Sequence, residues 1–170
     1  MELKRGLVHL YTGSGKGKTT AALGLCLRAL GWGLKCCFIQ FIKGKETGEL
    51  FSIGELPNFE FYQTGRPDYD FHPTEEDRER AKRGLLLARE KAKEVDLLVL
   101  DEINVAVHLG LIPLEEVIDF VKKKPLSLEL VLTGRHAKKE LIELSDYATY
   151  FQLLKHPFYR GIPARKGIDY

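Results

Sequence analysis

Three glycines and two lysines lie within six residues near the start of the chain, in the stretch YTGSGKGKTTAALG that runs from Tyr11 to Gly24. A glycine-rich turn after a strand can aim several backbone N–H groups at one anion, and the positive end of the following helix adds to that field. The stretch therefore predicts a phosphate-binding loop, with Lys18 as a mobile positive charge and the Thr19 hydroxyl as a ligand of Mg²⁺. The alternative, a flexible lysine-containing turn without a ligand, is disfavoured by the strand–loop–helix context.

One position of this loop departs from the common pattern of phosphate loops. That pattern, G-x-x-x-x-G-K-[ST], begins with a glycine, and this chain has Thr12 at the corresponding place. A phosphate loop also identifies nucleotide binding rather than a reaction, because one fold carries many chemistries. From the loop alone, phosphoryl transfer and mechanical ATP hydrolysis both remain open.

A pair of carboxylates gives a second, independent signal. In DLLVLDE four apolar residues run into Asp101 and Glu102, at the expected end of a strand. A carboxylate at such a place lies beside the phosphate loop and completes the Mg²⁺ site, usually through water. Asp101 alone could equally well cap a following helix. Together with the glycine loop, however, the pair favours binding of ATP with Mg²⁺.

The elements that must position these residues alternate along the chain. Apolar runs bounded by turn residues predict strands, and apolar residues at spacings of three and four predict helices. One long helix is expected to begin after Thr74 and to bury an apolar face made of Ala81, Leu85, Ala88 and Ala92. We expect strands at 7–11, 35–42, 59–63, 96–100, 128–132 and 148–153, and helices at 18–31, after 74, after 113 and at 138–144.

This alternation predicts an α/β fold with three layers, a mostly parallel sheet with helices on both faces. The loops that follow the strands then meet at one edge of the sheet, where ligands bind in such folds. The length of 170 residues suits a single domain over residues 1–170. The tail, about 155–170, is rich in proline and glycine, so we expect it to be ordered by docking.

Composition excludes some classes of protein. The 26 basic and 24 acidic residues leave a net charge of +2, which argues against a nucleic-acid partner. No apolar run approaches the roughly 20 residues that cross a bilayer, and no signal peptide is evident, so we expect a cytoplasmic protein without a membrane partner. The three cysteines form no C-x-x-C pair. Cys36 and Cys37 are adjacent in an expected strand and should be buried thiols on opposite faces.

Five segments, read together, resemble the corrinoid (cob(I)alamin) adenosyltransferases, a RecA-like family of P-loop proteins with a variant phosphate loop. They extend in order over nearly the whole chain: YTGSGKGKTTAALGL, QFIKG, VLDEINVAVHLGLIPLEEV, LTGR and KHPFYRGIPARKGIDY. The form T-G-x-G-K-G-K-T-T, without the first glycine, is that family's own. The resemblance implies transfer of the 5′-deoxyadenosyl group of ATP to the cobalt of a reduced corrinoid, with release of triphosphate.

The resemblance also implies roles for particular residues. Lys18, with Mg²⁺ held by Thr19 and Asp101 or Glu102, would stabilise the charge that grows on the leaving triphosphate. Lys18 and Glu102 are the expected catalytic residues. Arg28 matches a family arginine, although a solvated arginine on a helix face is nearly as plausible. The residues expected to bind the nucleotide are Thr12, Gly13, Ser14, Gly15, Lys16, Gly17, Lys18, Thr19, Thr20 and Arg28.

The corrinoid end of the site departs from the family. Family members carry G-F-T-W after a T-G step, and this chain has GRPDYDF at 65–71. Tyr69 and Phe71 could contact the corrinoid in place of the missing aromatic pair, or could simply be packing residues. Arg135 could face the triphosphate or form a structural ion pair. The family further implies a reductase or other electron donor and a homodimer.

Two other functions fit the phosphate loop. A RecA-like ATPase acting on nucleic acid would hydrolyse ATP in response to single strands, and its affinity would depend strongly on salt. A small-molecule kinase would release ADP and would need a lid with several arginines, of which the region after Gly134 offers few. The sequence supports both hypotheses less well than it supports adenosyl transfer.

Overall fold

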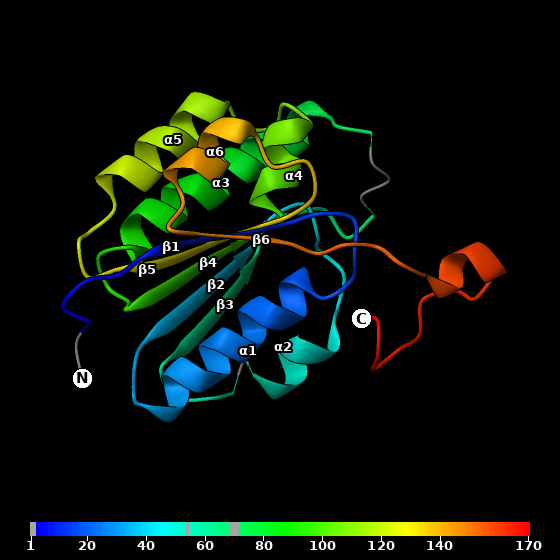
Figure 1. Cartoon of the computed structure of the whole chain (residues 1–170), viewed down its shortest axis with the longest axis horizontal. Helices are drawn as coiled ribbons and strands as arrows, with labels where there is room; N and C mark the ends of the chain where they lie inside the picture. The colour runs from blue at the N-terminus through cyan, green and yellow to red at the C-terminus, as the bar shows by residue number, and fades with distance from the viewer. Residues whose placement is uncertain (1–2, 54, 69–71) are drawn as a thin grey trace.

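The computed structural model describes residues 3–53, 55–68 and 72–170. Six parallel strands form one sheet in the order β3-β2-β4-β5-β1-β6 (Figure 1). The fold is therefore α/β with a parallel sheet, as the sequence predicts. The strands are β1 Val8–Thr12, β2 Cys36–Gln40, β3 Phe59–Gln63, β4 Leu97–Asp101, β5 Glu129–Thr133 and β6 Tyr147–Tyr150.

Helices cover both faces of this sheet and complete the three predicted layers. Figure 1 shows α1 and α2 on one face and α3, α4, α5 and α6 on the opposite face. The first pair is α1 Lys18–Gly31 and α2 Gly48–Ser52, and the second group is α3 Glu75–Lys91, α4 Ile103–His108, α5 Leu114–Lys123 and α6 Lys139–Leu144. After β6 the chain runs away from the sheet, forms the 3₁₀ turn η1 Pro157–Arg160, and brings its last residues back towards α2 (Figure 1).

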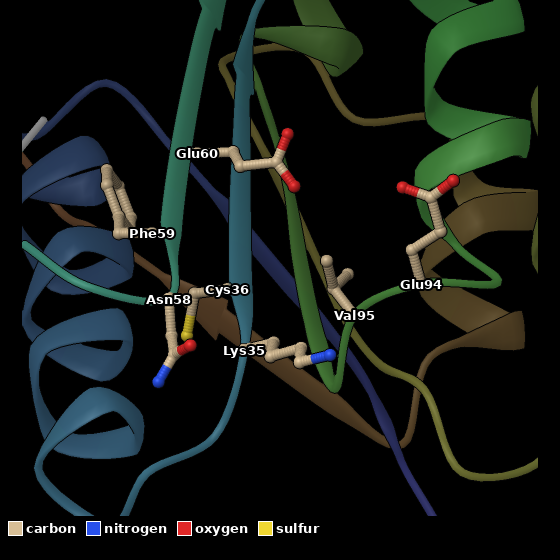
Figure 2. Close-up of a pocket in the computed structure, with 7 residues that line it drawn as sticks. All are labelled: Lys35, Cys36, Asn58, Phe59, Glu60, Glu94 and Val95. Carbon is tan, nitrogen blue, oxygen red and sulfur yellow. The ribbon is translucent and has the colours of Figure 1, made fainter.

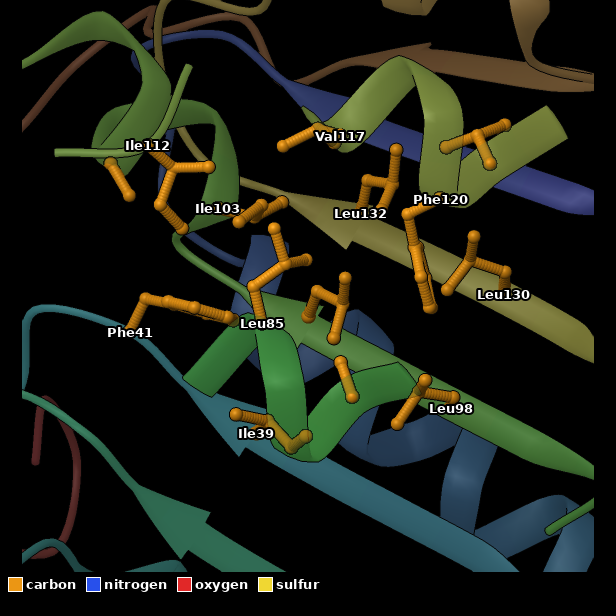
Figure 3. Packing of buried hydrophobic residues seen from close by; sticks show 14 of the residues in the cluster. Ile39, Phe41, Leu85, Leu98, Ile103, Ile112, Val117, Phe120, Leu130 and Leu132 are labelled. Atoms are coloured by element: carbon orange, nitrogen blue, oxygen red, sulfur yellow. The ribbon is translucent and has the colours of Figure 1, made fainter. Parts of the chain in front are cut away.

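The core lies between the sheet and these two helical layers. Figure 3 shows Leu85 of α3 and Phe120 of α5 packed onto side chains of the central strands. Every residue of β2 and β4 is buried, as expected for parallel strands covered on both faces. Cys36 and Cys37 belong to the two different core clusters, so their thiols do point to opposite faces. All three thiols are free and buried, as predicted.

Local sequence signals explain where the long helices begin. The Thr74 hydroxyl accepts the Asp77 N–H at 3.4 Å, and Asp77 Oδ2 accepts the Thr74 N–H at 2.8 Å, which makes a capping box at the start of α3. The predicted apolar face of α3 is buried as expected. At the other end of the domain α1 begins at Lys18, directly after Gly17 in a left-handed conformation.

Two short helices and the 3₁₀ turn were not predicted from the sequence. α2 has five residues and α4 has six, which is too short for a clear apolar periodicity. α4 matters for the site, because it begins directly after Asp101 and Glu102. Among the described residues, no helix combines the length and apolar character needed to cross a bilayer.

Candidate nucleotide and metal site

The predicted phosphate loop and carboxylates meet at the edge of the sheet formed by the carboxyl ends of its strands. Residues 13–17 connect β1 to α1, and Asp101 is the last residue of β4. In the sheet β5 lies between β1 and β4. The site is therefore spread over three neighbouring strands, at the edge where parallel α/β folds bind ligands.

The glycines of the loop are required by backbone that packs directly against them. Gly13 has φ of 100°, and a Cβ there would lie 2.4 Å from the carbonyl oxygen of Phe151, just after β6. A Cβ on Gly15 would lie 2.8 Å from the same oxygen, and the Gly15 N–H donates to it at 2.7 Å. Gly17, with φ of 116°, faces the Phe151 ring. Close approach and positive φ together exclude a side chain at Gly13.

Thr12 does not need to be glycine in this structure. It is the last residue of β1, and it is not among the residues with positive φ. Its hydroxyl oxygen accepts the backbone N–H of Ala137 at 3.4 Å. A side chain that departs from the common loop pattern thus helps to hold the start of the segment that leads into α6.

The two loop lysines are held by the protein itself. The buried Lys18 ammonium donates to the carbonyl oxygens of Gly13 and Gly15, both at 2.8 Å. Burial, with a contribution from Arg135, lowers the pKa of Lys18, opposed by the nearby carboxylates. The Lys16 ammonium donates to the carbonyl oxygen of Ile168 at 3.1 Å and forms an ion pair with Asp169 in the tail.

Asp101 is fully buried and accepts hydrogen bonds from three different elements. Its Oδ1 accepts the hydroxyl of Thr19 in α1 at 2.9 Å and that of Thr133 in β5 at 2.6 Å. Its Oδ2 accepts Nε2 of Gln40 in β2 at 2.8 Å. A buried carboxylate needs such donors, because taking an unpaired charge out of water costs several kcal/mol. The Thr19–Asp101 contact brings together the two predicted metal-binding segments.

Glu102 follows in a left-handed conformation with φ of 63°. Its N–H donates to the Thr133 hydroxyl at 3.0 Å, and its carboxylate lies 3.6 Å from the Lys43 ammonium. Burial, together with the neighbouring Asp101 charge, raises the pKa of Glu102 above its ordinary value. A cation beside Glu102 would lower this pKa again.

The oxygen donors at this edge fit Mg²⁺. One hydroxyl and two carboxylates, from Thr19, Asp101 and Glu102, are the ligand types that this hard cation prefers. Protein sites for Mg²⁺ commonly use one or two carboxylates, with phosphate and water completing the shell. In the part of the chain that the structure describes, no group of three or more histidine, cysteine, aspartate or glutamate side chains could hold a metal alone.

The remaining predicted residues are spread around this centre. Ser14 lies in the loop and the exposed Thr20 in the first turn of α1. Arg28 is exposed in the last turn of α1, ten residues and about 15 Å of helix from Lys18, so its role stays a prediction. Arg135 is exposed at the ligand edge and forms no ion pair within the described residues. Tyr69 and Phe71 lie outside the described residues.

The segment that leads towards 69–71 is anchored at its start. The Arg66 guanidinium pairs with the buried carboxylate of Asp77 at 2.7 Å. The backbone of Arg66 also forms an isolated parallel β-bridge with that of Lys43. Burial alone would raise the pKa of Asp77, but the hydrogen bonds from Arg66 and Thr74 lower it below its ordinary value. The same carboxylate thus caps α3 and fixes this segment beside the ligand edge.

Several residues of the site were not predicted as functional. Thr133 stands in the LTGR segment and Gln40 in QFIKG, and each is a polar side chain at the end of a buried strand. That signal could have singled them out. Phe151 gave no such signal, because its contribution is a backbone carbonyl brought to the loop by sheet pairing.

A hollow of about 460 Å³ lies at the opposite edge of the sheet (Figure 2). Its lining includes Lys35, Glu60 and Glu94, at the amino ends of β2, β3 and β4. Lys91 forms ion pairs with both acids, at 2.8 Å from Glu60 and 2.9 Å from Glu94. This hollow is separate from the phosphate loop and takes no part in the site.

Comparison with known proteins decides the family. The family model described as "ATP:corrinoid adenosyltransferase BtuR/CobO/CobP" matches residues 4–170. The chain belongs to this family. It is 40% identical over 179 residues to a protein of Sinorhizobium sp. named corrinoid adenosyltransferase, covering 98% of this chain and 81% of that one. It is 34% identical over 175 residues to a corrinoid adenosyltransferase of Escherichia coli strain K12, covering 98% and 87%. The resemblance seen in the sequence is confirmed.

The contact between Gly13 and Phe151 makes a testable prediction about this family's loop. Gly13→Ala places a methyl group against the Phe151 carbonyl at positive φ, which costs roughly 1–3 kcal/mol of strain. Moving the loop to relieve that strain should weaken ATP binding at least about tenfold, as measured by isothermal titration calorimetry.

Gly24→Ala is the matched control. Gly24 lies within α1, and no atom of the part of the chain that the structure describes comes within 4 Å of an added Cβ there. This variant should bind ATP like the parent and should be more stable by about 0.5–1 kcal/mol. Parental ATP affinity in Gly13→Ala would show that the loop does not need this glycine.

Proposed function

We propose that this protein moves the 5′-deoxyadenosyl group of ATP to the cobalt of a reduced corrinoid and releases triphosphate, in adenosylcobalamin biosynthesis or salvage. One observation carries the proposal. The T-G-x-G-K-G-K-T-T loop is tied to the strand-end carboxylate through Thr19 and Asp101, in a chain whose family match covers residues 4–170.

The loop's part in this reaction is to hold the group that leaves. When cobalt(I) attacks C5′, negative charge grows on the α-phosphate oxygen of the departing triphosphate. Lys18 and the Gly15 N–H would exchange their present carbonyl partners for the triphosphate when ATP binds. They would then already be in place to stabilise this charge at the moment of reaction. Burial lowers the pKa of Lys18, and a polyphosphate beside it would raise that pKa.

The metal-binding side would be formed by Thr19, Asp101 and Glu102. Bound Mg²⁺ supplies positive charge next to the leaving phosphates. Asp101 already accepts the Thr19 hydroxyl hydrogen, which leaves the oxygen lone pairs of Thr19 free to face a cation. Glu102 contributes a second carboxylate at the same strand end, balanced by Lys43.

The acceptor side would lie next to these residues, around Lys43, Lys45 and the segment at 64–68. Cobalt(I) is itself a strong nucleophile, so the attack requires no general base. Tyr69 and Phe71 are proposed to contact the corrinoid in place of the family's aromatic pair. Arg135, exposed beside the loop, is proposed to meet the triphosphate.

The proposal also covers the protein's domain organisation, location, oligomeric state and electron donor. Residues 1–170 are proposed to act as a single nucleotide-binding domain with a docked tail, and the Lys16–Asp169 pair supports this. We also propose a cytoplasmic enzyme that works as a homodimer and receives electrons from a reductase or another donor, as the family resemblance implies.

Product analysis tests the proposed reaction. Incubation with Mg-ATP and chemically generated cob(I)alamin should produce a light-sensitive cobalt–carbon bond, seen by absorption spectroscopy, together with one triphosphate for each bond formed. Release of ADP or phosphate without an adenosylated corrinoid would contradict the proposal and would favour a kinase or an ATPase.

Lys18→Ala tests the role of the loop within that reaction. Removing one preorganised charge from the leaving group should lower turnover roughly 10²- to 10³-fold, while circular dichroism stays like that of the parent. Lys139→Ala is the control, because Lys139 is exposed in α6 and its one ion pair within the described residues is with Glu143. Equal turnover in the two variants would show that Lys18 has no role in catalysis.

A further inference from the structure

A row of polar side chains crosses the sheet at its ligand edge. Gln40 at the end of β2 has Asp101 of β4 as its register partner on one side and Gln63 of β3 on the other. Gln40 is fully buried. Its Nε2 donates to Asp101 Oδ2 at 2.8 Å, and its Oε1 accepts Nε2 of Gln63 at 2.9 Å. Strand register alone places these three residues side by side.

The direction of every hydrogen bond in this row follows from Asp101. A carboxylate only accepts, so Gln40 must turn its amide nitrogen towards Asp101 and its carbonyl oxygen towards Gln63. Gln63 must then present its own nitrogen to Gln40. The second hydrogen of that nitrogen goes to the carbonyl oxygen of Lys45 at 2.9 Å. All the hydrogen bonds along the row therefore point the same way, and the Asp101 carboxylate determines that direction.

The far end of the row reaches the loops proposed to lie on the acceptor side. Lys45 belongs to the segment after β2, and Lys43 of the same segment pairs with Glu102 at 3.6 Å. The Gly65 N–H donates to the carbonyl oxygen of Lys43 at 3.2 Å. Both carboxylates at the end of β4 are thus joined to this segment, Asp101 through the two glutamines and Glu102 through Lys43.

We propose that Gln40 and Gln63 are positioning residues for Mg-ATP binding. This inference rests on the proposed role of Asp101 at the metal. Gln40 fixes the rotation of the Asp101 carboxylate, so that Oδ1 faces Thr19. Gln63 fixes the orientation of the Gln40 amide and ties it to the backbone at Lys45. Partners of this kind, one step away from a metal, typically change metal affinity 10- to 100-fold when they are removed.

The energetic reason lies in the burial of Asp101. Without Gln40, Oδ2 would keep no donor among the hydrogen bonds of the described residues, and leaving a buried charged acceptor unsatisfied is strongly unfavourable. The carboxylate could relieve this cost by rotating towards Thr19 and Thr133, which would move the oxygen that faces the metal site. Removal of Gln63 leaves the hydrogen bond from Gln40 to Asp101 in place. It weakens that bond only indirectly, through the orientation of the Gln40 amide.

Gln40→Met and Gln63→Met test the proposal, because methionine keeps the side-chain length and removes the amide. ATP binding is measured by calorimetry across a Mg²⁺ titration, without any corrinoid. Gln40→Met should raise the Mg²⁺ concentration for half-maximal binding roughly 10- to 100-fold. Gln63→Met should raise it by less, and neither variant should change ATP affinity in the absence of Mg²⁺.

The double variant tests the order of action. Because Gln63 acts through Gln40, the pair of changes should shift the Mg²⁺ requirement no further than Gln40→Met alone. Thr47→Val is the control, since it removes from the neighbouring segment a buried hydroxyl that has no hydrogen-bond partner among residues 3–53, 55–68 and 72–170. This control should keep the parental Mg²⁺ requirement.

Three outcomes would overturn the proposal. They are a parental Mg²⁺ requirement in a folded Gln40→Met, additive shifts in the double variant, and an equal loss of ATP affinity with and without Mg²⁺. If Gln40→Met does not fold, Gln63→Met, at a more exposed position, serves as the test. A parental Mg²⁺ requirement in Gln63→Met would then contradict the proposal. The experiment uses no corrinoid, so failure of adenosyl transfer would show only in the product assay described above.

Discussion

The burial of one carboxylate, Asp101, is the constraint on which the ligand edge depends. A charge with no access to water must be surrounded by donors, and this one receives them from α1, β5 and β2. Those elements can reach it because β4 stands between β2 and β5 in the sheet. The strand order, the start of α1 and the two glutamines are therefore all linked to the position of a single side chain.

The phosphate loop has a related property, because its donors are already engaged by the protein. The Gly15 N–H donates to Phe151, Lys18 holds the loop carbonyls, and Lys16 pairs with Asp169. A triphosphate must exchange these contacts for its own. At Lys18 the exchange would replace neutral carbonyl acceptors with an opposite charge. At the Gly15 N–H it would replace a neutral hydrogen bond with a charge-assisted one, which is roughly twice as strong.

Much of this arrangement could be predicted from the sequence, because the signals involved are local. The capping box at Thr74 and the glycine loop before Lys18 each lie within a few residues, and both predictions locate elements correctly. The meeting of Thr19 with Asp101 was also expected, from the rule that strand ends share one edge of a parallel sheet.

The remaining contacts depend on strand register, which a single sequence does not state. Gln40 lies beside Gln63 and Asp101 only because β2, β3 and β4 pair in one particular register. Phe151 reaches Gly13 and Gly15 for the same reason, through pairing of β6 with β1. The short helix α4 was missed because six residues are too few for a clear period.

These features support one chemical proposal, that the loop and the carboxylates proposed to bind Mg²⁺ hold the group that departs. The bond that breaks is then the one between C5′ and oxygen, and the phosphorus–oxygen bonds stay intact. The most direct test uses ATP with ¹⁸O in the oxygen that joins C5′ to the α-phosphorus, reacted with cob(I)alamin and analysed by mass spectrometry. We predict that all of the label leaves in the triphosphate. Label retained on the adenosine product would show that a phosphorus–oxygen bond breaks and would contradict the account.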